Sequence, residues 1–472
     1  MENQRKVLLS DKSSEILNQL RKNGISSGEV FGAIRFEKQV FFSSTKIFDC
    51  RITEKTGYGI RFQKDGKVFF LSIDDINFKS INTIIKNSLN NPAHAYSSKI
   101  FEFANPKESK MNKNFLKVAD PRITEISLEE IISTAKSISE IVYASKSPFF
   151  LNSSHYSTIE THIVLINSND LILNYTDTFR YFQAQLIAGT KRELTLIQLL
   201  SRLYRNLDTD LESVIEHELE ESKNYRKIKR VNANQILPVV LDSNCMCQIG
   251  DIILRPFLTR LLSPVIHEER KKISFSHKID LIERSDDPNR IGSLPFDHEG
   301  TSTRPLNLIQ AGNQKDTPLD LLNAKDAGKL PTGNSLRGIP FISSTNIYRN
   351  PPSPVLTNLT VRTYNESDES LIEGVKKGIM LKGFNSLNYF DIENGDFELY
   401  STEAFNIKNG QLRSSTGKIT VFGNIFELLS TVEAVGNKPT SGYFSSIPSL
   451  RISRMRILGK PKKGLTRFLV PG

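Results

Sequence analysis

Three side chains that could do chemistry, Asp297, His298 and Glu299, stand next to one another in the segment PFDHEGTSTRP, residues 295–305. Carboxylate and imidazole groups can bind a metal ion or transfer protons. On a strand, however, neighbouring side chains point to opposite faces, and on a helix they lie about 100° apart, so three in a row rarely meet at one ion. The proline and glycine residues of the segment favour an irregular connection. Of the two interpretations, a polar turn is favoured over a metal or acid–base site.

Two further histidine–glutamate pairs occur, at His217-Glu218 and His267-Glu268. A catalytic zinc usually needs three protein ligands, and the helical signature HExxH supplies two histidines one turn apart. Neither pair is followed by a second histidine at that distance. His217 lies off the apolar face of a charged helix, and His267 precedes a basic run that would repel a cation. Both are interpreted as solvated histidines.

Other catalytic patterns are equally weak. The sequence contains no GxSxG elbow, and no Walker or dinucleotide-binding glycine pattern follows a strand. Asp286 and Asp287 form a pair of carboxylates, but they are adjacent and directly precede Pro288, as in a solvated acidic turn.

The composition is that of a soluble protein. The chain has 472 residues, of which 38% are hydrophobic and 24% charged, enough for real hydrophobic cores. No apolar run approaches the ~18 residues of a membrane span, and the N-terminus lacks the apolar stretch of a signal peptide. The three cysteines Cys50, Cys245 and Cys247 cannot build a disulfide framework. We therefore expect a cytoplasmic protein that makes no membrane contact.

The net charge of +10 could indicate a nucleic-acid surface. Basic residues are spread among acidic ones, however, and the densest clusters, at 226–230 and 459–467, carry no interleaved aromatic residues for base stacking. A mildly basic soluble protein is favoured over a dedicated nucleic-acid binder.

The elements that must position these residues fall into blocks. The first unit, residues 10–90, should contain a helix over 12–23 capped by Ser10 or Asp11, short strands with an Asp65-Gly66 hairpin, and a helix over 78–90. A polar linker is expected at 91–115. The second unit, 116–228, begins with a capping box at Ser127 and Glu130, continues with strands and closes with a charged helix over 209–227.

The largest region, 234–456, starts with a strand and an apolar helix that Pro256 should kink. Strand-like segments separated by Gly, Asn and Pro turns follow it, and a basic tail covers 457–472. Blocks of strands beside blocks of helices predict an α+β fold: two smaller α/β units followed by a large strand-rich C-terminal domain.

Several segments of the third region occur in the order found in one known family. They are GSLPFDHEGTSTRP, AGK (327–329), TGNSLR (332–337), TNL (357–359), NGDF (394–397), IKNG (407–410), GNI (423–425) and PSL (448–450). Together they resemble the TldD/PmbA family, historically called modulators of DNA gyrase and associated with zinc-dependent peptide cleavage. The signature positions are Pro295, Phe296, Asp297, Glu299, Gly300, Thr303, Thr332, Gly333, Asn334 and Arg337.

The resemblance implies a scaffold role for these positions, or a place at the border of a cleft. His298 stands where the family often has Asp, which argues against a required metal ligand. Weaker matches at 57–61 and 167–168 extend the resemblance to about residues 10–455. Asp170 departs from the family's usual Gly, but Asp tolerates left-handed backbone better than most residues.

The catalytic branch of the family carries HExxxH on the helix after the strand that ILPVVLDS (236–243) resembles, and a cysteine near the C-terminus. Here that helix reads NCMCQIGDIILRPFLTRLLS (244–263), without His or Glu, and 435–450 contain no cysteine. The resemblance thus implies a PmbA-like (TldE-like) branch. We expect no catalytic residue, no metal ligand and no cofactor in this chain, with zinc only in a TldD-like partner.

Three functions are compatible with the sequence. The leading hypothesis is a non-catalytic TldE-like subunit of a two-component zinc metallopeptidase, which acts on peptides and completes the substrate cleft of a TldD-like partner. The alternatives are a nucleic-acid or DNA-gyrase-associated regulatory factor, and an independent hydrolase with an unrecognised site. A homodimer is also open, and the sequence does not identify the peptide.

Overall fold

The computed structural model describes most of the chain. The described residues are 2–74, 78–91, 95–97, 101–106, 118–145, 149–190, 193–221, 231, 234–263, 274–288, 290–338 and 346–459. His267, the basic cluster at 226–230 and the tail from residue 460 onward lie outside these ranges. None of the helices within them combines the length and apolar character that a membrane crossing requires.

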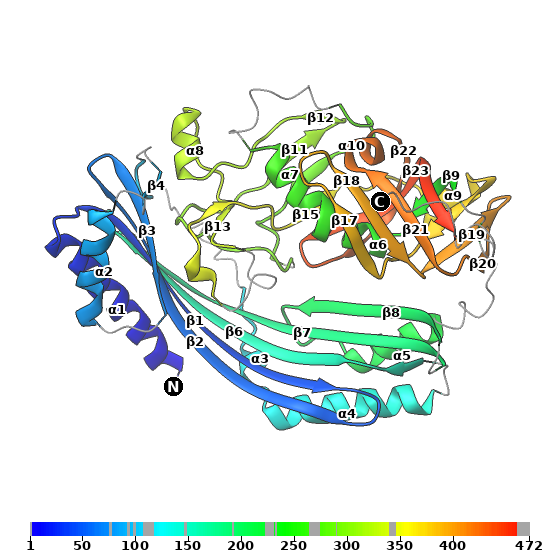
Figure 1. Ribbon diagram of the computed structural model, residues 1–472, viewed down its shortest axis with the longest axis horizontal. Helices are drawn as coiled ribbons and strands as arrows, with labels where there is room; N and C mark the ends of the chain where they lie inside the picture. Colours follow the sequence, from blue (N-terminus) through cyan, green and yellow to red (C-terminus); the bar gives the residue numbers. More distant parts are fainter. Residues whose placement is uncertain are drawn as a thin grey trace, which may run out of the picture.

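A long, curved antiparallel sheet forms the N-terminal half (Figure 1). Within the described residues it has eight strands in the order β4-β3-β2-β1-β6-β7-β5, with β8 also paired to β7. Adjacent strands are antiparallel throughout. The strands are β1 (Ser27–Phe42), β2 (Ile47–Lys64), β3 (Lys67–Ile73), β4 (Ala95–Ser97), β5 (Phe149–Leu151), β6 (Ser154–Asn167), β7 (Ile172–Thr190) and β8 (Glu193–Tyr204).

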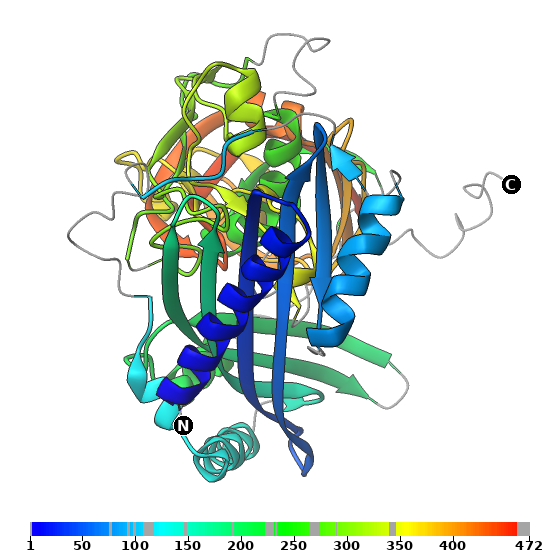
Figure 2. The same ribbon diagram turned by 90° about the vertical axis from the view of Figure 1, so that its left-hand side faces the viewer.

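Helices cover one face of this sheet and the C-terminal domain lies against the other (Figures 1 and 2). On β1, Val30 and Ile34 pack with the first helix, whereas the alternate residues Phe31 and Ala33 pack against the C-terminal domain. This alternation is the two-residue period of a strand with both faces buried. The helices are α1 (Glu2–Lys22), α2 (Phe78–Asn90), α3 (Pro121–Glu125), α4 (Leu128–Ala144) and α5 (Leu211–Glu221).

Local signals in the sequence locate several of these elements. The Asp65-Gly66 hairpin is confirmed, with φ angles of 51° and 74° and a two-residue connection between β2 and β3. The Ser127–Glu130 capping box of α4 is also present. The expected cap at Ser10 or Asp11 is wrong, because α1 begins at Glu2 and runs through both residues. Its buried residues include Leu9, so packing on the sheet extends the helix beyond the predicted start.

The strands of the two predicted N-terminal units join one sheet, since β1 of the first pairs with β6 of the second from Glu29 to Phe42. Part of the expected linker is also packed, because Phe101 and Phe103 are buried. The predicted α+β class with a large strand-rich C-terminal domain is confirmed, and the domain boundaries themselves stay a prediction.

The C-terminal domain is built on a mixed sheet with 13 strands in the described residues. Its main path is β12-β11-β10-β15-β23-β9-β16-β19-β20, and β17, β18, β21 and β22 branch from it. These strands are β9 (Gln235–Leu241), β10 (Leu281–Glu283), β11 (Leu306–Gln310), β12 (Asn313–Gln314), β15 (Leu359–Val361), β16 (Lys377–Leu381), β17 (Ser386–Phe390), β18 (Asp396–Ser401), β19 (Ala404–Lys408), β20 (Gln411–Ser415), β21 (Ile419–Asn424), β22 (Val432–Ser441) and β23 (Ser445–Gly459).

Short helices and one small ribbon complete this domain. They are α6 (Ser243–Ile249), the π-helix η3 (Gly250–Leu254), α7 (Arg255–Leu261), α8 (Leu321–Asp326), the 3₁₀-helix η5 (Ile347–Arg349), α9 (Asp368–Glu373), α10 (Ile425–Ser430) and the paired strands β13 (Ser335–Leu336) and β14 (Ser353–Pro354).

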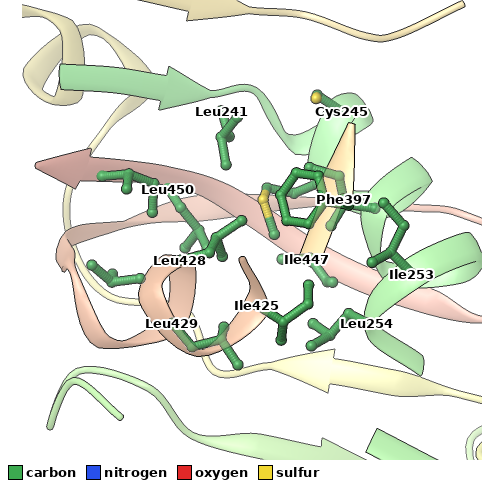
Figure 3. Packing of buried hydrophobic residues seen from close by; sticks show 14 of the residues in the cluster. Leu241, Cys245, Ile253, Leu254, Phe397, Ile425, Leu428, Leu429, Ile447 and Leu450 are labelled. Carbon is green, nitrogen blue, oxygen red and sulfur yellow. The ribbon is translucent and has the colours of Figure 1, made fainter. Parts of the chain in front are cut away.

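The continuous helix α6–η3–α7 packs its apolar side into the core of the domain. Ile253 and Leu254 lie among side chains from β9, α10 and β23, including Leu241, Ile425 and Ile447 (Figure 3). Each such buried side chain contributes ~1.5–3 kcal/mol to stability. The segment before the predicted kink residue is a π turn. Because proline lacks an N–H and its ring crowds the preceding turn, a local widening of this kind accommodates it.

Candidate functional site between the sheet and the C-terminal domain

The segment that contains Asp297, His298 and Glu299 is a turn, as predicted, with a hydrogen bond from the Gly300 N–H to the Asp297 carbonyl of 3.1 Å. It is not a surface turn: the three side chains are 1%, 0% and 1% exposed. Gly300 has a φ of 85°, and a Cβ there would lie 2.6 Å from the Leu171 side chain. Glycine therefore lets the turn approach the sheet closely.

The three side chains point to different partners. Asp297 accepts hydrogen bonds from the N–H groups of its neighbours Glu299 and Thr301, at 3.0 and 2.9 Å, and from the Ser335 N–H at 3.0 Å. The Asp297 carboxylate thus ties two loops together. Burial, and then the charge of Glu299, raise the pKa of Asp297 well above its usual value.

His298 is held as a neutral ring between the sheet and β13. Its Nδ1 accepts the Arg337 N–H at 3.0 Å, and its Nε2 lies 3.3 Å from the Tyr175 hydroxyl. Burial, and then the charge of Arg337, lower the pKa of His298 to about 3. Both ring nitrogens are engaged, so this histidine is placed for structure and not for metal binding.

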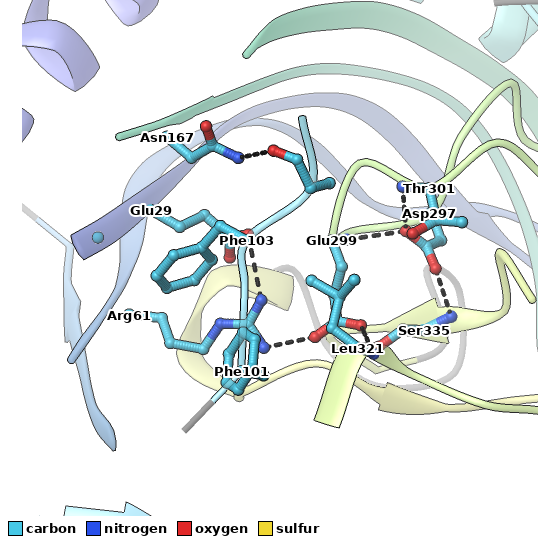
Figure 4. Close-up of polar contacts among 12 residues, drawn as sticks. Glu29, Arg61, Phe101, Phe103, Asn167, Asp297, Glu299, Thr301, Leu321 and Ser335 are labelled. Atoms are coloured by element: carbon cyan, nitrogen blue, oxygen red, sulfur yellow. Dashed lines mark hydrogen bonds and ion pairs between the residues drawn. The ribbon is translucent and has the colours of Figure 1, made fainter. Parts of the chain in front are cut away.

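Glu299 belongs to a buried ion network that crosses the interface between the sheet and the C-terminal domain (Figure 4). Arg61 on β2 contacts Glu299 at 2.5 Å and Glu29 on β1 at 3.1 Å. Arg337 contacts the other oxygen of Glu29 at 2.6 Å. Glu299 also accepts the Leu321 N–H at 2.8 Å. The two arginines and two glutamates alternate, so each buried charge meets an opposite one.

Aromatic rings cover this network. The Arg61 guanidinium lies over the rings of Phe101 and Phe103, at 4.7 and 5.2 Å from their centroids. Arg337 lies over Phe31 and Phe70 at 4.9 and 5.6 Å. The rings keep water from the ion pairs, which strengthens attraction between charges that are fully paired.

The remaining signature residues hold the surrounding loops. Thr303 donates to the Leu294 carbonyl at 2.7 Å, and the Thr332 hydroxyl contacts both the N–H and the carbonyl of Leu319. Gly333 has a φ of 76° and lies so close to the Ser302 carbonyl that a Cβ would be 2.3 Å away. The same packed region contains the signature residues Pro295, Phe296 and Asn334, of which Phe296 and Asn334 are buried.

A separate cavity of about 450 Å³ lies between the end of the sheet and the C-terminal domain. None of the signature residues lines it. Its wall comes from β8, α5, the helix α6–η3, the segments on either side of Gly383 and Gly442, and Glu403. The lining includes Ser201, Arg202, Leu203, His217, Glu218, Asn244, Cys247, Gln248, Asp251, Ile252, Lys382, Phe384, Asn385, Leu387, Glu403 and Tyr443.

The helical wall of the cavity does not fit a catalytic zinc ion. Asp251 is fully used: it accepts the N–H groups of Tyr443 and Phe444 at 2.6 and 2.9 Å and the Ser445 hydroxyl at 2.7 Å. The Cys247 thiol donates to the Thr440 carbonyl at 2.9 Å, and burial raises its pKa to about 11. Within the described ranges, no three His, Cys, Asp or Glu residues gather as a metal site would require.

Glu403, which sequence reasoning did not single out, is an acid that lines the cavity. It lies between β18 and β19, and Lys382 and Gly383 bring the neighbouring segment against it. Burial, and then the carboxylates of Glu218 and Asp242, raise the pKa of Glu403 to about 8. His217, predicted as solvated, is exposed and also lines the cavity beside Glu218. Nothing in the local sequence marks Glu403, because the fold alone brings it to α5.

Residues 236–459 match the family model described as PmbA/TldA metallopeptidase C-terminal domain. Over these residues the chain matches the TldD/PmbA family. A metalloprotease TldD homolog of Buchnera aphidicola subsp. Acyrthosiphon pisum is 31% identical over 149 residues, which are 32% of this chain and 29% of that relative. The aligned stretch thus covers less than a third of the length of the TldD homologs that the chain matches.

Other comparisons extend over nearly the whole chain. An uncharacterized protein of Methanocaldococcus jannaschii is 24% identical over 429 residues, 87% of this chain and 92% of its own length. The crystal structure of TldE from Thermococcus kodakarensis has the same fold, with a TM-score of 0.78, 18% identity, and coverage of 95% and 100% of the two chains. A proposed modulator of a DNA gyrase from Thermotoga maritima gives a TM-score of 0.79 at 18% identity, covering 95% and 99%.

Proposed function

We propose that this chain is a non-catalytic, TldE-like subunit that binds peptides and completes the substrate cleft of a TldD-like, zinc-bearing partner. One observation carries the proposal. On the helix that borders the 450 Å³ cavity, Asp251 is committed to the N–H groups of Tyr443 and Phe444 and to the Ser445 hydroxyl, and burial keeps Cys247 protonated. The cavity is present in this chain, while the groups that would hold a metal on its helical wall are absent or engaged.

The chemistry of peptide hydrolysis supports this division of labour. A zinc ion activates its bound water only when the protein holds it in a fixed, open coordination site. The helix after β9, where the catalytic branch is expected to carry HExxxH, has no His or Glu in this chain. The metal chemistry would therefore come from the partner, and this chain would contribute a wall of the cleft and contacts to the peptide.

An enclosed cleft gives a peptidase two advantages. Excluding water strengthens electrostatic interactions at the reaction centre, and walls keep folded proteins away from it. A related chain placed opposite the catalytic subunit could supply such a wall. We expect an interface that buries at least ~1,000 Å² in total, with an apolar centre and a polar rim.

Co-expression with a relative that carries HExxxH tests the proposal. We expect the two chains to elute as one complex from a size-exclusion column, and metal analysis to find one zinc ion per complex and none in this chain alone. As a control, the relative with its HExxxH glutamate replaced by glutamine should still form the complex. Separate elution of the two chains, or one tightly bound zinc per purified copy of this chain, would contradict the proposal.

The net charge of +10 is the observation that favours the second candidate, a nucleic-acid-associated factor. Binding of the purified chain to duplex DNA, measured at increasing salt, separates the two. A steep loss of affinity with salt, together with a preferred DNA sequence, would support a DNA-binding role. Weak binding without sequence preference would instead support the role as a peptidase subunit.

A further inference from the structure

We propose that a basic groove on the C-terminal domain binds an acidic peptide segment through the carboxylates of its Asp or Glu side chains. The groove is separate from the 450 Å³ cavity, with which it shares no lining residue. The inference therefore does not depend on the proposed function. The lining consists of Arg304, Leu306, Lys315, Asp316, Thr317, Leu319, Gly328, Lys329, Leu330 and Thr332.

Three segments enclose the groove: the end of the signature turn, the turn after β12, and the end of α8. Figure 1 shows α8 and β12 on the side of the C-terminal domain that faces away from β8. The volume of about 410 Å³ lies within the range of ~300–1,000 Å³ typical of ligand pockets. The first and third segments belong to the motifs PFDHEGTSTRP and AGK (327–329), to which the proposed function assigns no ligand.

The charges that line the groove are unbalanced. Arg304, Lys315 and Lys329 are exposed, and none of them forms an ion pair or a side-chain hydrogen bond with the described part of the chain. Asp316 is the one carboxylate among the lining residues, and its Oδ2 already accepts the Asn307 N–H at 2.9 Å. The groove thus gathers three unpaired cations against one engaged carboxylate, which favours a ligand with negative charge.

The backbone that carries these cations is held in place, although their side chains are exposed. The Lys315 N–H donates to the Leu308 carbonyl at 2.9 Å, and the Lys329 N–H donates to the Ala324 carbonyl at 2.9 Å. Arg304 follows a signature threonine whose hydroxyl is hydrogen-bonded, and it precedes a proline. Cations on a fixed backbone lose less freedom when a ligand binds than cations on a loose loop.

An apolar side chain in the groove favours a peptide over other anions. Leu330 is 76% exposed, whereas Leu306 and Leu319 in the same lining are buried. A peptide segment can place carboxylates on the cations and an apolar side chain on Leu330 at the same time, and arginine binds a carboxylate with two parallel hydrogen bonds. An inorganic anion would leave Leu330 in water, and the lining offers no aromatic ring for a nucleic-acid base to stack on.

Two blocked peptides of equal length test the requirement for carboxylates. Acetyl-Ala-Asp-Leu-Glu-Ala-amide carries two carboxylates and a leucine, and acetyl-Ala-Asn-Leu-Gln-Ala-amide has neutral amides in place of the carboxylates. Isothermal titration of the purified full-length chain at physiological salt should detect binding of the acidic peptide. The amide peptide should bind at least about 10-fold more weakly, because charge-assisted hydrogen bonds are lost.

Single substitutions locate the site. Arg304→Gln, Lys315→Gln and Lys329→Gln should each weaken binding of the acidic peptide about 5–10-fold. Their midpoints in urea unfolding should stay unchanged, since these side chains have no partners in the described part of the chain. Lys325→Gln is the matched control: it removes an exposed lysine of α8 that does not line the groove, and its affinity should equal that of the unaltered chain.

A substitution of the opposite kind should strengthen binding. Asp316→Asn removes the one negative charge of the lining and keeps a side-chain oxygen that can accept the Asn307 N–H. The acidic peptide should therefore bind at least about 3-fold more tightly, because it no longer meets a like charge. A loss of affinity in this variant at an unchanged unfolding midpoint would contradict the proposed site.

Three results would overturn the inference. They are failure of the acidic peptide to bind, equal affinity for the acidic and amide peptides, and an effect of Lys325→Gln as large as that of the groove variants. A short DNA duplex serves as the competing probe. If the duplex binds and Arg304→Gln weakens it while the acidic peptide does not bind, the groove is a phosphate site and the peptide assignment is wrong.

Discussion

Arg61 joins three parts of the chain that lie far apart in the sequence. Its guanidinium contacts Glu29 and Glu299, and Phe101 and Phe103 cover it. A buried charge of this kind is tolerated only when opposite charges and hydrogen bonds surround it. Here the alternation of Glu29, Arg61 and Glu299 satisfies that condition, and the turn at 295–300 contributes an anchor between two domains.

Removing one charge of the network should destabilise the protein strongly. We expect Glu299→Gln to lower the free energy of unfolding by about 3 kcal/mol, because it leaves excess buried positive charge beside Arg61. The matched control is Glu427→Gln, which breaks the exposed pair with Arg454 and should cost less than about 1 kcal/mol. Urea unfolding of both variants measures the difference, and equal losses would contradict a stabilising role for the network.

Glu403 should make stability depend on pH. Its pKa of about 8 lies above the ordinary value of 4.5, so between these two values the folded state holds a proton that the unfolded state has released. The unfolding free energy therefore falls as pH rises through this window. Between pH 5 and pH 9, Glu403→Gln should lose less stability than the unaltered chain, by about 1–3 kcal/mol after allowance for partial exposure of the site. Thermal unfolding at both pH values checks this, and parallel curves would refute it.

At the scale of elements, the sequence predicts the turns and caps that depend on residues close together along the chain. The Asp65-Gly66 hairpin, the capping box of α4 and the positive φ of 61° at Asp170 all follow from side chains within a few positions. The turn at 295–300 was predictable for the same reason. The burial of that turn, and the meeting of Glu403 with α5, depend on contacts across the whole fold, so no local pattern could indicate them.

Two glycines with nearly equal backbone angles test how closely the turns pack. Gly333 and Gly66 have φ angles of 76° and 74°, but a Cβ on Gly333 would lie 2.3 Å from the Ser302 carbonyl, whereas a Cβ on Gly66 meets nothing within 4 Å. Gly66→Ala should therefore cost only the backbone strain of about 1 kcal/mol. Gly333→Ala should cost at least about 2 kcal/mol more, because backbone must move. Equal midpoints in urea unfolding would show that the loops at 302 and 333 are not packed as described.

For the whole molecule, the arrangement is a curved sheet with helices on one face and the C-terminal domain on the other (Figure 1). The buried network and the signature turn hold the domain on the sheet near β1 and β2, while the cavity lies at the β8 end. The signature residues thus hold the C-terminal domain on the sheet, and other residues line the cavity. This separation would let the chemistry of the cavity change while the fold is kept.

The most direct test of the proposed role is a titration of peptidase activity. The zinc-bearing relative, at fixed concentration with a fluorogenic peptide, is mixed with increasing amounts of this chain. We predict that the cleavage rate rises and saturates at one copy of this chain per relative, and that this chain alone cleaves nothing. A rate for the relative that stays unchanged at every ratio, or cleavage by this chain alone, would contradict the account.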